Sequence, residues 1–242
     1  MPIRYPFLFV LCAISAMAAC SKEPEPASVS GPTPAAAPAP VAIAQGSKAL
    51  DLYRQLREQK NWELAAPVGQ EVVAKYPGSP AASEVQQTLA DTTAQATAQT
   101  TRRRLERLWS YQSGKESGGE QNTASIYSSD AAAADRVRLI LRRHSAWGQS
   151  AYLFGSGKGF DCRGTCSLAA HFDDQAQKIK AYLPPTGEPA LFINDDKAFI
   201  AKLHGTRKLS VEVIEKGKAP RALVFEVGGF DADNFPLLAK KK

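Results

Sequence analysis

The 242-residue chain has few of the residues that most often carry chemistry, with only four cysteines and three histidines. The apolar run over residues 7 to about 19 is too short for a membrane-spanning helix, which needs roughly 20 apolar residues. No serine or cysteine stands in a recognisable nucleophile turn, and Gly155-Ser156-Gly157-Lys158 lacks the outer glycine and the hydroxyl residue of a phosphate loop. We therefore expect no cofactor and no metal.

Residues 1–19 have the layout of a secretory signal peptide, because Arg4 precedes an apolar run that ends in small residues. The ending Met17-Ala18-Ala19-Cys20 resembles the lipobox of bacterial lipoproteins, with Met17 where leucine is commonest. In that family the cysteine is acylated, and Ser21 after it usually directs the protein to the outer membrane. The resemblance implies lipidation of Cys20 and anchoring on the periplasmic face of the outer membrane. An ordinary signal peptide with an incidental cysteine is the alternative.

Two cysteines remain after such processing, because Cys12 leaves with the signal peptide and Cys20 takes the lipid. In an oxidising periplasm Cys162 and Cys166 are expected to pair, and Gly164 between them can take the positive φ of a tight turn. A redox site would show Cys-X-X-Cys beside a thioredoxin-like pattern, and zinc would need two further ligands. A structural disulfide is the prediction, with redox and metal chemistry as alternatives.

Residues 20–45 are predicted to form the lipidated cysteine and a disordered tether. Residues 21–43 contain six prolines and no aromatic side chain, so they cannot bury apolar surface. At about 3.1 Å per residue in polyproline II conformation, the segment reaches on the order of 70 Å. The globular part could thus stand away from the membrane.

Residues 46–108 carry the periodicity of a helical hairpin and a long connecting helix. Two helical segments are separated by a break near Lys60-Asn61, and the second segment ends at Pro77-Gly78-Ser79-Pro80. The segment KNWELAAPVGQEVVAKYPGSPAA resembles one tetratricopeptide-type hairpin, with Pro67 as a departure from the pattern. One such unit cannot bury its own face, so it must dock on the following helix or on the next domain. The residues predicted to face inward are Leu52, Leu56, Trp62, Ala65, Val72, Val73 and Tyr76.

Residues 109–242 change to alternating apolar and polar positions, which is typical of half-buried strands. Turn signals separate about eight short strands, and one short helix is expected over residues 195–203. The predicted fold is therefore α+β, with an N-terminal helical hairpin and long helix followed by an antiparallel β-sandwich over residues 109–242. Trp109, Tyr111 and Trp147 are predicted to lie in its core.

Residues 109–235 resemble a set of uncharacterised secreted and lipoprotein domains of Gram-negative bacteria. The likeness rests on the stretches LRRHSAWGQSAYLFGSGKGFDCRGTCSLAAHFDD, ALFINDDKAF and FEVGGFD, which contain a WGxS-type turn, a paired-cysteine hairpin, an FDD ending and a closing FxVxGF strand. The resemblance implies a fold and no established activity.

The function predicted from these features is that of a non-catalytic binding or scaffold module for an envelope protein or glycan, with an inhibitor or immunity protein as a more specific version. The candidate binding surface is the strand face carrying Arg136, Arg138 and Arg142, because arginine and aromatic residues tend to dominate interfaces. The net charge of +6 suggests attraction to anionic surfaces. However, the runs Arg102-Arg103-Arg104 and Lys240-Lys241-Lys242 are expected to be solvated, and nucleic acid is not an expected partner in this compartment.

The alternative is a cell-wall hydrolase or metal-dependent enzyme that uses His171 and nearby aspartates. His171 and Asp173 could form an acid/base pair, and Asp173-Asp174 or Asp195-Asp196 could supply paired carboxylates or a calcium site. Aspartates at strand ends and helix caps more often accept hydrogen bonds from backbone N–H groups. A structural role in turns and caps is therefore favoured over a catalytic or calcium-binding one.

Overall fold

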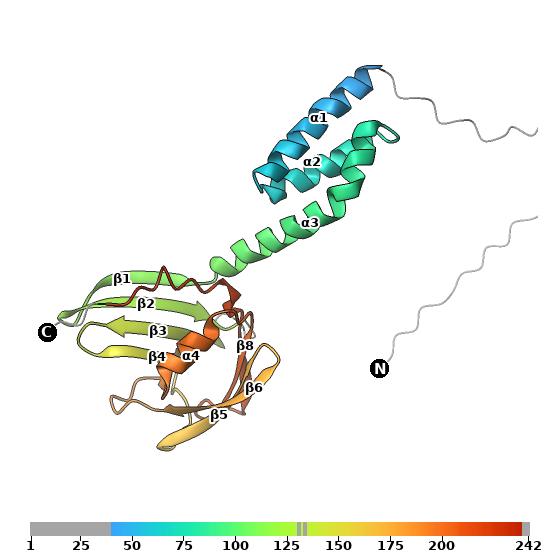
Figure 1. Ribbon diagram of the computed structural model, residues 1–242. Helices are drawn as coiled ribbons and strands as arrows, with labels where there is room; N and C mark the ends of the chain where they lie inside the picture. The colour runs from blue at the N-terminus through green and yellow to red at the C-terminus, as the bar shows by residue number, and fades with distance from the viewer. Residues whose placement is uncertain (1–39, 130–131, 133–134, 239–242) are drawn as a thin grey trace, which may run out of the picture. The chain divides into compact units, whose positions relative to one another are not determined.

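The computed structural model describes residues 40–129, 132 and 135–238 of the chain (Figure 1). The predicted signal peptide, Cys20, residues 20–39 of the predicted tether and Lys240-Lys241-Lys242 lie outside the described residues. Helices come first and strands follow, which confirms the α+β class. The elements are α1 (Pro40–Glu58), α2 (Trp62–Lys75), α3 (Pro80–Glu106), β1 (Ser110–Glu116), β2 (Gly119–Tyr127), β3 (Arg138–His144), β4 (Gly148–Phe154), β5 (Thr165–Phe172), β6 (Gln175–Tyr182), β7 (Ala190–Ile193), α4 (Asp196–Leu203), β8 (Leu209–Val213), β9 (Arg221–Phe225) and the 3-10 helix η2 (Val227–Gly229).

Helix α1 begins at Pro40, earlier than the boundary at residue 46 that composition suggests. It packs against the end of α2, where a Cβ atom built on Gly46 would come within 3.3 Å of the Tyr76 ring. This close contact lies at the first residue of the segment that composition assigns to the helical hairpin. No helix in the described part of the chain is long and apolar enough to span a membrane.

Helices α1, α2 and α3 form a bundle around one apolar cluster. Tyr53 of α1 is 2% exposed, and its hydroxyl group forms hydrogen bonds of 2.9 and 2.8 Å with the hydroxyl groups of Thr88 and Thr92 in α3. The predicted hairpin therefore docks on the following helix. The cluster consists of Leu50, Tyr53, Leu56, Ala65, Val72, Ala81 and Val85.

One inward-facing position in α1 was assigned wrongly from the sequence, because Leu52 is 46% exposed. The buried stripe of α1 runs through Leu50, Tyr53 and Leu56 instead, and a spacing of three residues keeps side chains on one helix face. The predicted break and stop agree with the structure. Lys60 has a positive φ of 55° between α1 and α2, and Ser79 Oγ caps α3 by accepting a 3.1 Å hydrogen bond from the Ala82 N–H.

The run Arg102-Arg103-Arg104 is exposed, as expected of solvated positions, and each of its arginines also forms an ion pair. The first arginine pairs within α3 at 2.8 Å. Arg103 pairs with Glu63 of α2, and Arg104 pairs with Glu226 in the segment after β9. Carboxylates therefore balance this run locally.

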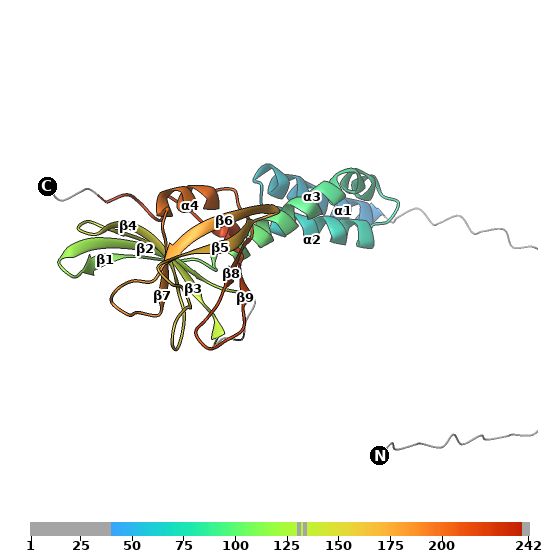
Figure 2. The same ribbon diagram turned by 90° about the horizontal axis from the view of Figure 1, so that it is seen from below.

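The nine strands of the described residues form one antiparallel sheet with the order β1-β2-β3-β4-β7-β6-β5-β8-β9. The sheet curves strongly (Figures 1 and 2). The Ser129 N–H after β2 donates a 2.7 Å hydrogen bond to the Val224 carbonyl of β9, so the two ends of the sheet approach each other. The predicted sandwich is thus a single curved sheet whose halves share one core.

Helix α4 confirms the short helix predicted at residues 195–203 and contributes to this core. Its buried residues Phe199, Ile200 and Leu203 belong to the same apolar cluster as the inward-facing residues of the strands, and Figure 1 shows the helix lying against the curved sheet. Phe172 of β5 meets Phe199 edge to face, with ring centroids 5.7 Å apart. Helix α4 therefore covers apolar surface that the curvature alone would leave open.

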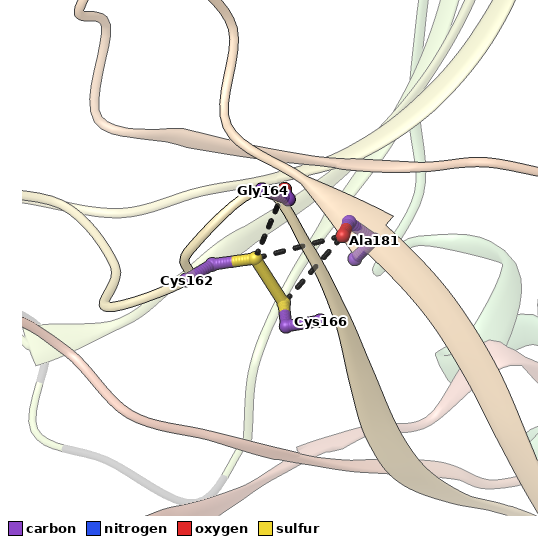
Figure 3. Close-up of a disulfide and its surroundings, with 4 residues drawn as sticks. All are labelled: Cys162, Gly164, Cys166 and Ala181. Atoms are coloured by element: carbon purple, nitrogen blue, oxygen red, sulfur yellow. Dashed lines mark hydrogen bonds between the residues drawn. A yellow bond between two sulfur atoms is a disulfide. The ribbon is translucent and has the colours of Figure 1, made fainter.

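A disulfide joins Cys162 in the loop before β5 to Cys166, the second residue of β5, and this is the pair expected from the sequence (Figure 3). The Cα atoms of the two cysteines are 5.6 Å apart, and Gly164 between them has the positive φ of 61° expected of a tight turn. Both sulfur atoms lie 3.5 Å from the Ala181 carbonyl oxygen of β6. The disulfide thus joins the preceding loop to the start of β5, next to β6.

Candidate binding face

The arginines of β3 lie on the side of the sheet that is turned away from the core. Leu139 and Leu141 are fully buried, which confirms the predicted alternation. Arg138 and Arg142 take alternate positions and are partly exposed. Arg136 lies in the exposed segment before β3. The structure therefore brings two of the three predicted arginines together on one strand face.

Arg138 is held between aromatic rings of the two neighbouring strands. The strand register places Tyr127 of β2 and Phe154 of β4 on either side of it. Its guanidinium carbon lies 5.8 Å from the Tyr127 ring centroid and 5.9 Å from that of Phe154. Both distances are within the roughly 6 Å range of a cation–π interaction. These contacts hold the guanidinium group above the sheet with its N–H edges available.

Arg142 is held in a similar way near the other end of β3. Its guanidinium carbon lies 5.3 Å from the Trp147 ring centroid and 5.5 Å from that of Tyr152. Its Nε–H donates a 3.2 Å hydrogen bond to the Ser150 hydroxyl oxygen. The side chain is therefore positioned by two rings and one neutral hydrogen bond.

A row of aromatic rings continues across the sheet from Tyr152. The Tyr152 and Phe192 rings are stacked with centroids 4.6 Å apart, and the Phe192 and Tyr182 rings are tilted with centroids 5.7 Å apart. These residues come from β4, β7 and β6, which are adjacent in the sheet. Together they extend the two arginine sites into one surface. We call this surface the arginine–aromatic face and define it by Tyr127, Arg138, Arg142, Trp147, Tyr152, Phe154, Tyr182 and Phe192.

The positive charges of the arginine–aromatic face are not paired directly with carboxylates. Among the described residues, neither Arg138 nor Arg142 is in contact with a carboxylate. Burial raises the pKa of the Tyr152 hydroxyl group, the charges of Arg142 and Arg138 oppose that rise, and the negative charge of Glu188 adds to it. Tyrosine is neutral at about pH 7 even without a raised pKa. The two guanidinium groups therefore have no direct carboxylate contact among the described residues, and Glu188 is an acidic residue whose charge acts on the same face.

Trp147 is 52% exposed, so its predicted place in the core is wrong, whereas Trp109 is buried and Tyr111 packs against the core. The turn that presents Trp147 is fixed by buried His144, whose ring stacks on the Trp147 ring at 3.8 Å. His144 Nδ1 accepts hydrogen bonds from the N–H groups of Ala146 and Trp147. The protonated nitrogen is therefore Nε2, which donates to the backbone carbonyl of Glu116 at 2.9 Å.

The residues of the hydrolase alternative are not assembled into one site. His171 is exposed on β5. The Asp173 carboxylate accepts hydrogen bonds of 3.0 and 2.9 Å from the backbone N–H groups of Arg207 and Lys208, so it braces a turn. The hollow beside this turn is lined by Asp173 and His204 but not by His171.

The second aspartate pair also has structural contacts. Asp195 caps α4 by accepting a 3.0 Å hydrogen bond from the Ala198 N–H. Asp196 accepts a 3.3 Å hydrogen bond from the Gln149 side-chain amide, and burial raises the pKa of its carboxyl group. In the part of the chain that the structure describes, no three histidine, cysteine, aspartate or glutamate side chains are grouped to hold a metal ion.

Sequence reasoning found the two arginines but missed the rings around them. One local signal was available. Tyr152 and Phe154 of β4 alternate along the strand with buried Ala151 and Leu153, so their side chains are expected to face outward. No local signal could have found Phe192, since β7 reaches β4 only through the order of strands in the sheet.

No family model matches this chain, and no curated protein matches it. Among solved structures, the chain is similar to the crystal structure of invasion associated protein B from Bartonella henselae. The two chains have 19% sequence identity and a TM-score of 0.36. The match covers 50% of this chain and 84% of that chain.

Proposed function

We propose that the protein is a non-catalytic binding module of the bacterial envelope and that it binds its partner through the arginine–aromatic face. The observation that carries the proposal is the placement of Arg138 and Arg142 between aromatic rings without a carboxylate partner among the described residues. Arginine and aromatic side chains contribute strongly to interfaces. Side chains already held in place also lose less conformational entropy on binding.

The envelope location in this proposal comes from the N-terminal sequence. The lipobox-like ending at Cys20 supports lipidation, and the proline-rich segment after it supports a tether to the periplasmic face of the outer membrane. Replacing Cys20 with serine is expected to abolish palmitate labelling and to release the protein from the membrane fraction. Unchanged labelling and fractionation would refute the anchor.

The charge of the arginine–aromatic face provides the test of binding. Full-length protein purified in mild detergent is immobilised and exposed to solubilised envelope extract and peptidoglycan fragments. The double variant Arg138→Glu/Arg142→Glu is expected to lose the partner that the wild type retains. The matched control Lys48→Glu/Lys115→Glu makes the same change in net charge at exposed positions outside the face and is expected to retain it.

Two results would overturn the proposal. One is that the wild type and the Arg138→Glu/Arg142→Glu variant retain the partner equally well, which would show that the face does not take part in binding. The other is cleavage of peptidoglycan by the wild type that is lost when His171 becomes alanine, which would establish the hydrolase alternative. Circular dichroism of each variant checks that the fold is retained, which is needed because Arg138 and Arg142 are only partly exposed and contact aromatic rings.

A further inference from the structure

We infer that the arginine–aromatic face binds an acidic glycan, a sugar polymer whose rings stack on the exposed aromatic side chains and whose carboxylate or phosphate groups bind Arg138 and Arg142. The inference rests on the proposed function, because it names the partner class of the same face. Three observations support it: the spacing of the two arginines, the aromatic rings between them and the exposure of those rings to solvent.

The two arginines are separated by four residues on one strand, which corresponds to about 13 Å at roughly 3.3 Å per residue. A single small anion cannot bridge that distance, whereas a polymer with repeated acidic groups can. Each guanidinium group presents planar N–H donors, which suit carboxylate and phosphate oxygens. The spacing therefore favours an extended polyanion over a free ion.

The surface between the arginines is lined by rings and is not itself charged. Ile140 lies between the two arginines on β3 and is directly opposite Tyr152, which stacks on Phe192. A ligand that fits this stretch needs an apolar surface between its anionic groups. Sugar rings offer C–H groups on their flat sides, and these suit the electron-rich faces of aromatic rings. A polymer of acidic amino acids without rings lacks this match.

The rings are open to solvent, since Tyr127, Trp147 and Tyr182 are 55%, 52% and 39% exposed. The strongest contacts of protein–protein interfaces usually lie in well-packed, desolvated pockets. An exposed row of rings on a sheet instead favours a ligand that lies along the surface. A second copy of the chain is a poor occupant, because a symmetric contact would bring the arginines of one copy close to those of the other.

Binding is measured with full-length protein in mild detergent and four fluorescently labelled polymers. Polygalacturonate carries carboxylates on sugar rings, and phosphorylated mannan carries phosphates, so the comparison of these two distinguishes the source of the anion. Neutral dextran has rings without charge, and poly-L-glutamate has charge without rings. We expect one of the acidic glycans to bind at least about tenfold more tightly than dextran or poly-L-glutamate, since charge-assisted hydrogen bonds and ring stacking act together.

Variants separate the two contributions to binding. Arg138→Gln/Arg142→Gln is expected to raise the dissociation constant of the acidic glycan at least about tenfold. Tyr182→Ala, which removes one exposed ring that packs on Phe192 and leaves both arginines in place, is expected to raise it about threefold to tenfold. The Lys48→Glu/Lys115→Glu control should remain within about twofold of the wild type, because separated surface charges are screened by salt.

Several outcomes would overturn the inference. Tighter binding of poly-L-glutamate than of both acidic glycans would indicate an acidic protein segment, and equal binding of neutral dextran would show that the arginines do not select the ligand. If no polymer binds but this face still retains a protein from envelope extract, the glycan inference fails and the proposed function stands. If the face retains nothing in either experiment, both fail.

Discussion

Arg104 and Glu226 form a two-hydrogen-bond ion pair across 122 positions of the sequence. The Arg104 Nη1–H and Nη2–H groups donate to the two carboxylate oxygens of Glu226 at 2.9 and 2.7 Å. Arg104 lies in the last turns of α3, and Glu226 lies directly after β9. The end of the helical segment is therefore connected to the end of the last strand by a specific contact as well as by the chain.

This ion pair predicts a pH dependence of stability. Hydrogen bonds from Arg104 and its positive charge lower the pKa of Glu226 below its usual value of 4.5. A carboxyl group with a lowered folded-state pKa stabilises the fold above its unfolded-state pKa, and this stabilisation is lost as the pH falls through the folded-state pKa. Glu226→Gln is therefore expected to lower the melting temperature at about pH 7 and to have little effect well below pH 4.5. A difference in melting temperature that stays constant with pH would contradict this account.

The backbone beside this pair leaves no room for a side chain at Gly229. A Cβ atom built there would lie 2.2 Å from the Leu105 carbonyl carbon and 2.3 Å from the Glu106 nitrogen. Gly229→Ala must therefore separate α3 from η2, at a cost of about 1–3 kcal/mol in unfolding free energy. Gly114→Ala is the matched control, because a Cβ atom there meets no atom within 4 Å. Urea denaturation of both variants checks the prediction, and equal midpoints would show that the contact is not tight.

The alternation of β3 was readable from the sequence because it is a local property of a half-buried strand. Leu139 and Leu141 face the core and Arg138 and Arg142 face outward, as predicted. Burial of Ile140, which is only 6% exposed although it lies on the outward face, was not predictable. It results from neighbours on other strands, and strand order is set by contacts between residues far apart in sequence.

Errors in the sequence interpretation have a similar cause. Trp147 was assigned to the core, but its ring is held on the surface by contacts with His144 and Arg142. The ion pairs of Arg103 and Arg104 depend on the packing of α3 against α2 and η2, which local pattern does not reveal.

The turn that presents Trp147 depends on His144. His144→Ala would leave the N–H groups of Ala146 and Trp147 without their acceptor and the Glu116 carbonyl without its donor. We expect a loss of about 1–3 kcal/mol in unfolding free energy and weaker binding at the arginine–aromatic face. His171→Ala serves as the control, because this exposed histidine should change stability by only about 0.5 kcal/mol. Equal unfolding free energies for the two variants in denaturation experiments would contradict the role of His144.

The disulfide is expected to stabilise the fold without taking part in binding. Replacing both Cys162 and Cys166 with serine should lower the unfolding free energy by about 2 kcal/mol, because closing so short a loop restricts the unfolded chain only modestly. Binding at the arginine–aromatic face should be unchanged. Treatment with a reductant should destabilise the wild type and leave the double variant unaffected. A loss of binding in the double variant with its fold intact would indicate a functional role for the pair.

Site-specific photo-crosslinking in living cells tests the arginine–aromatic face most directly. A photoreactive phenylalanine analogue is placed at Tyr127 or Tyr182 on the face, and at Leu52 or Ile214, which are comparably exposed elsewhere. The account predicts adducts from the two face positions that disappear when Arg138 and Arg142 are changed to glutamate, with no such adducts from the control positions. Adducts from Leu52 or Ile214 with none from Tyr127 and Tyr182 would contradict it.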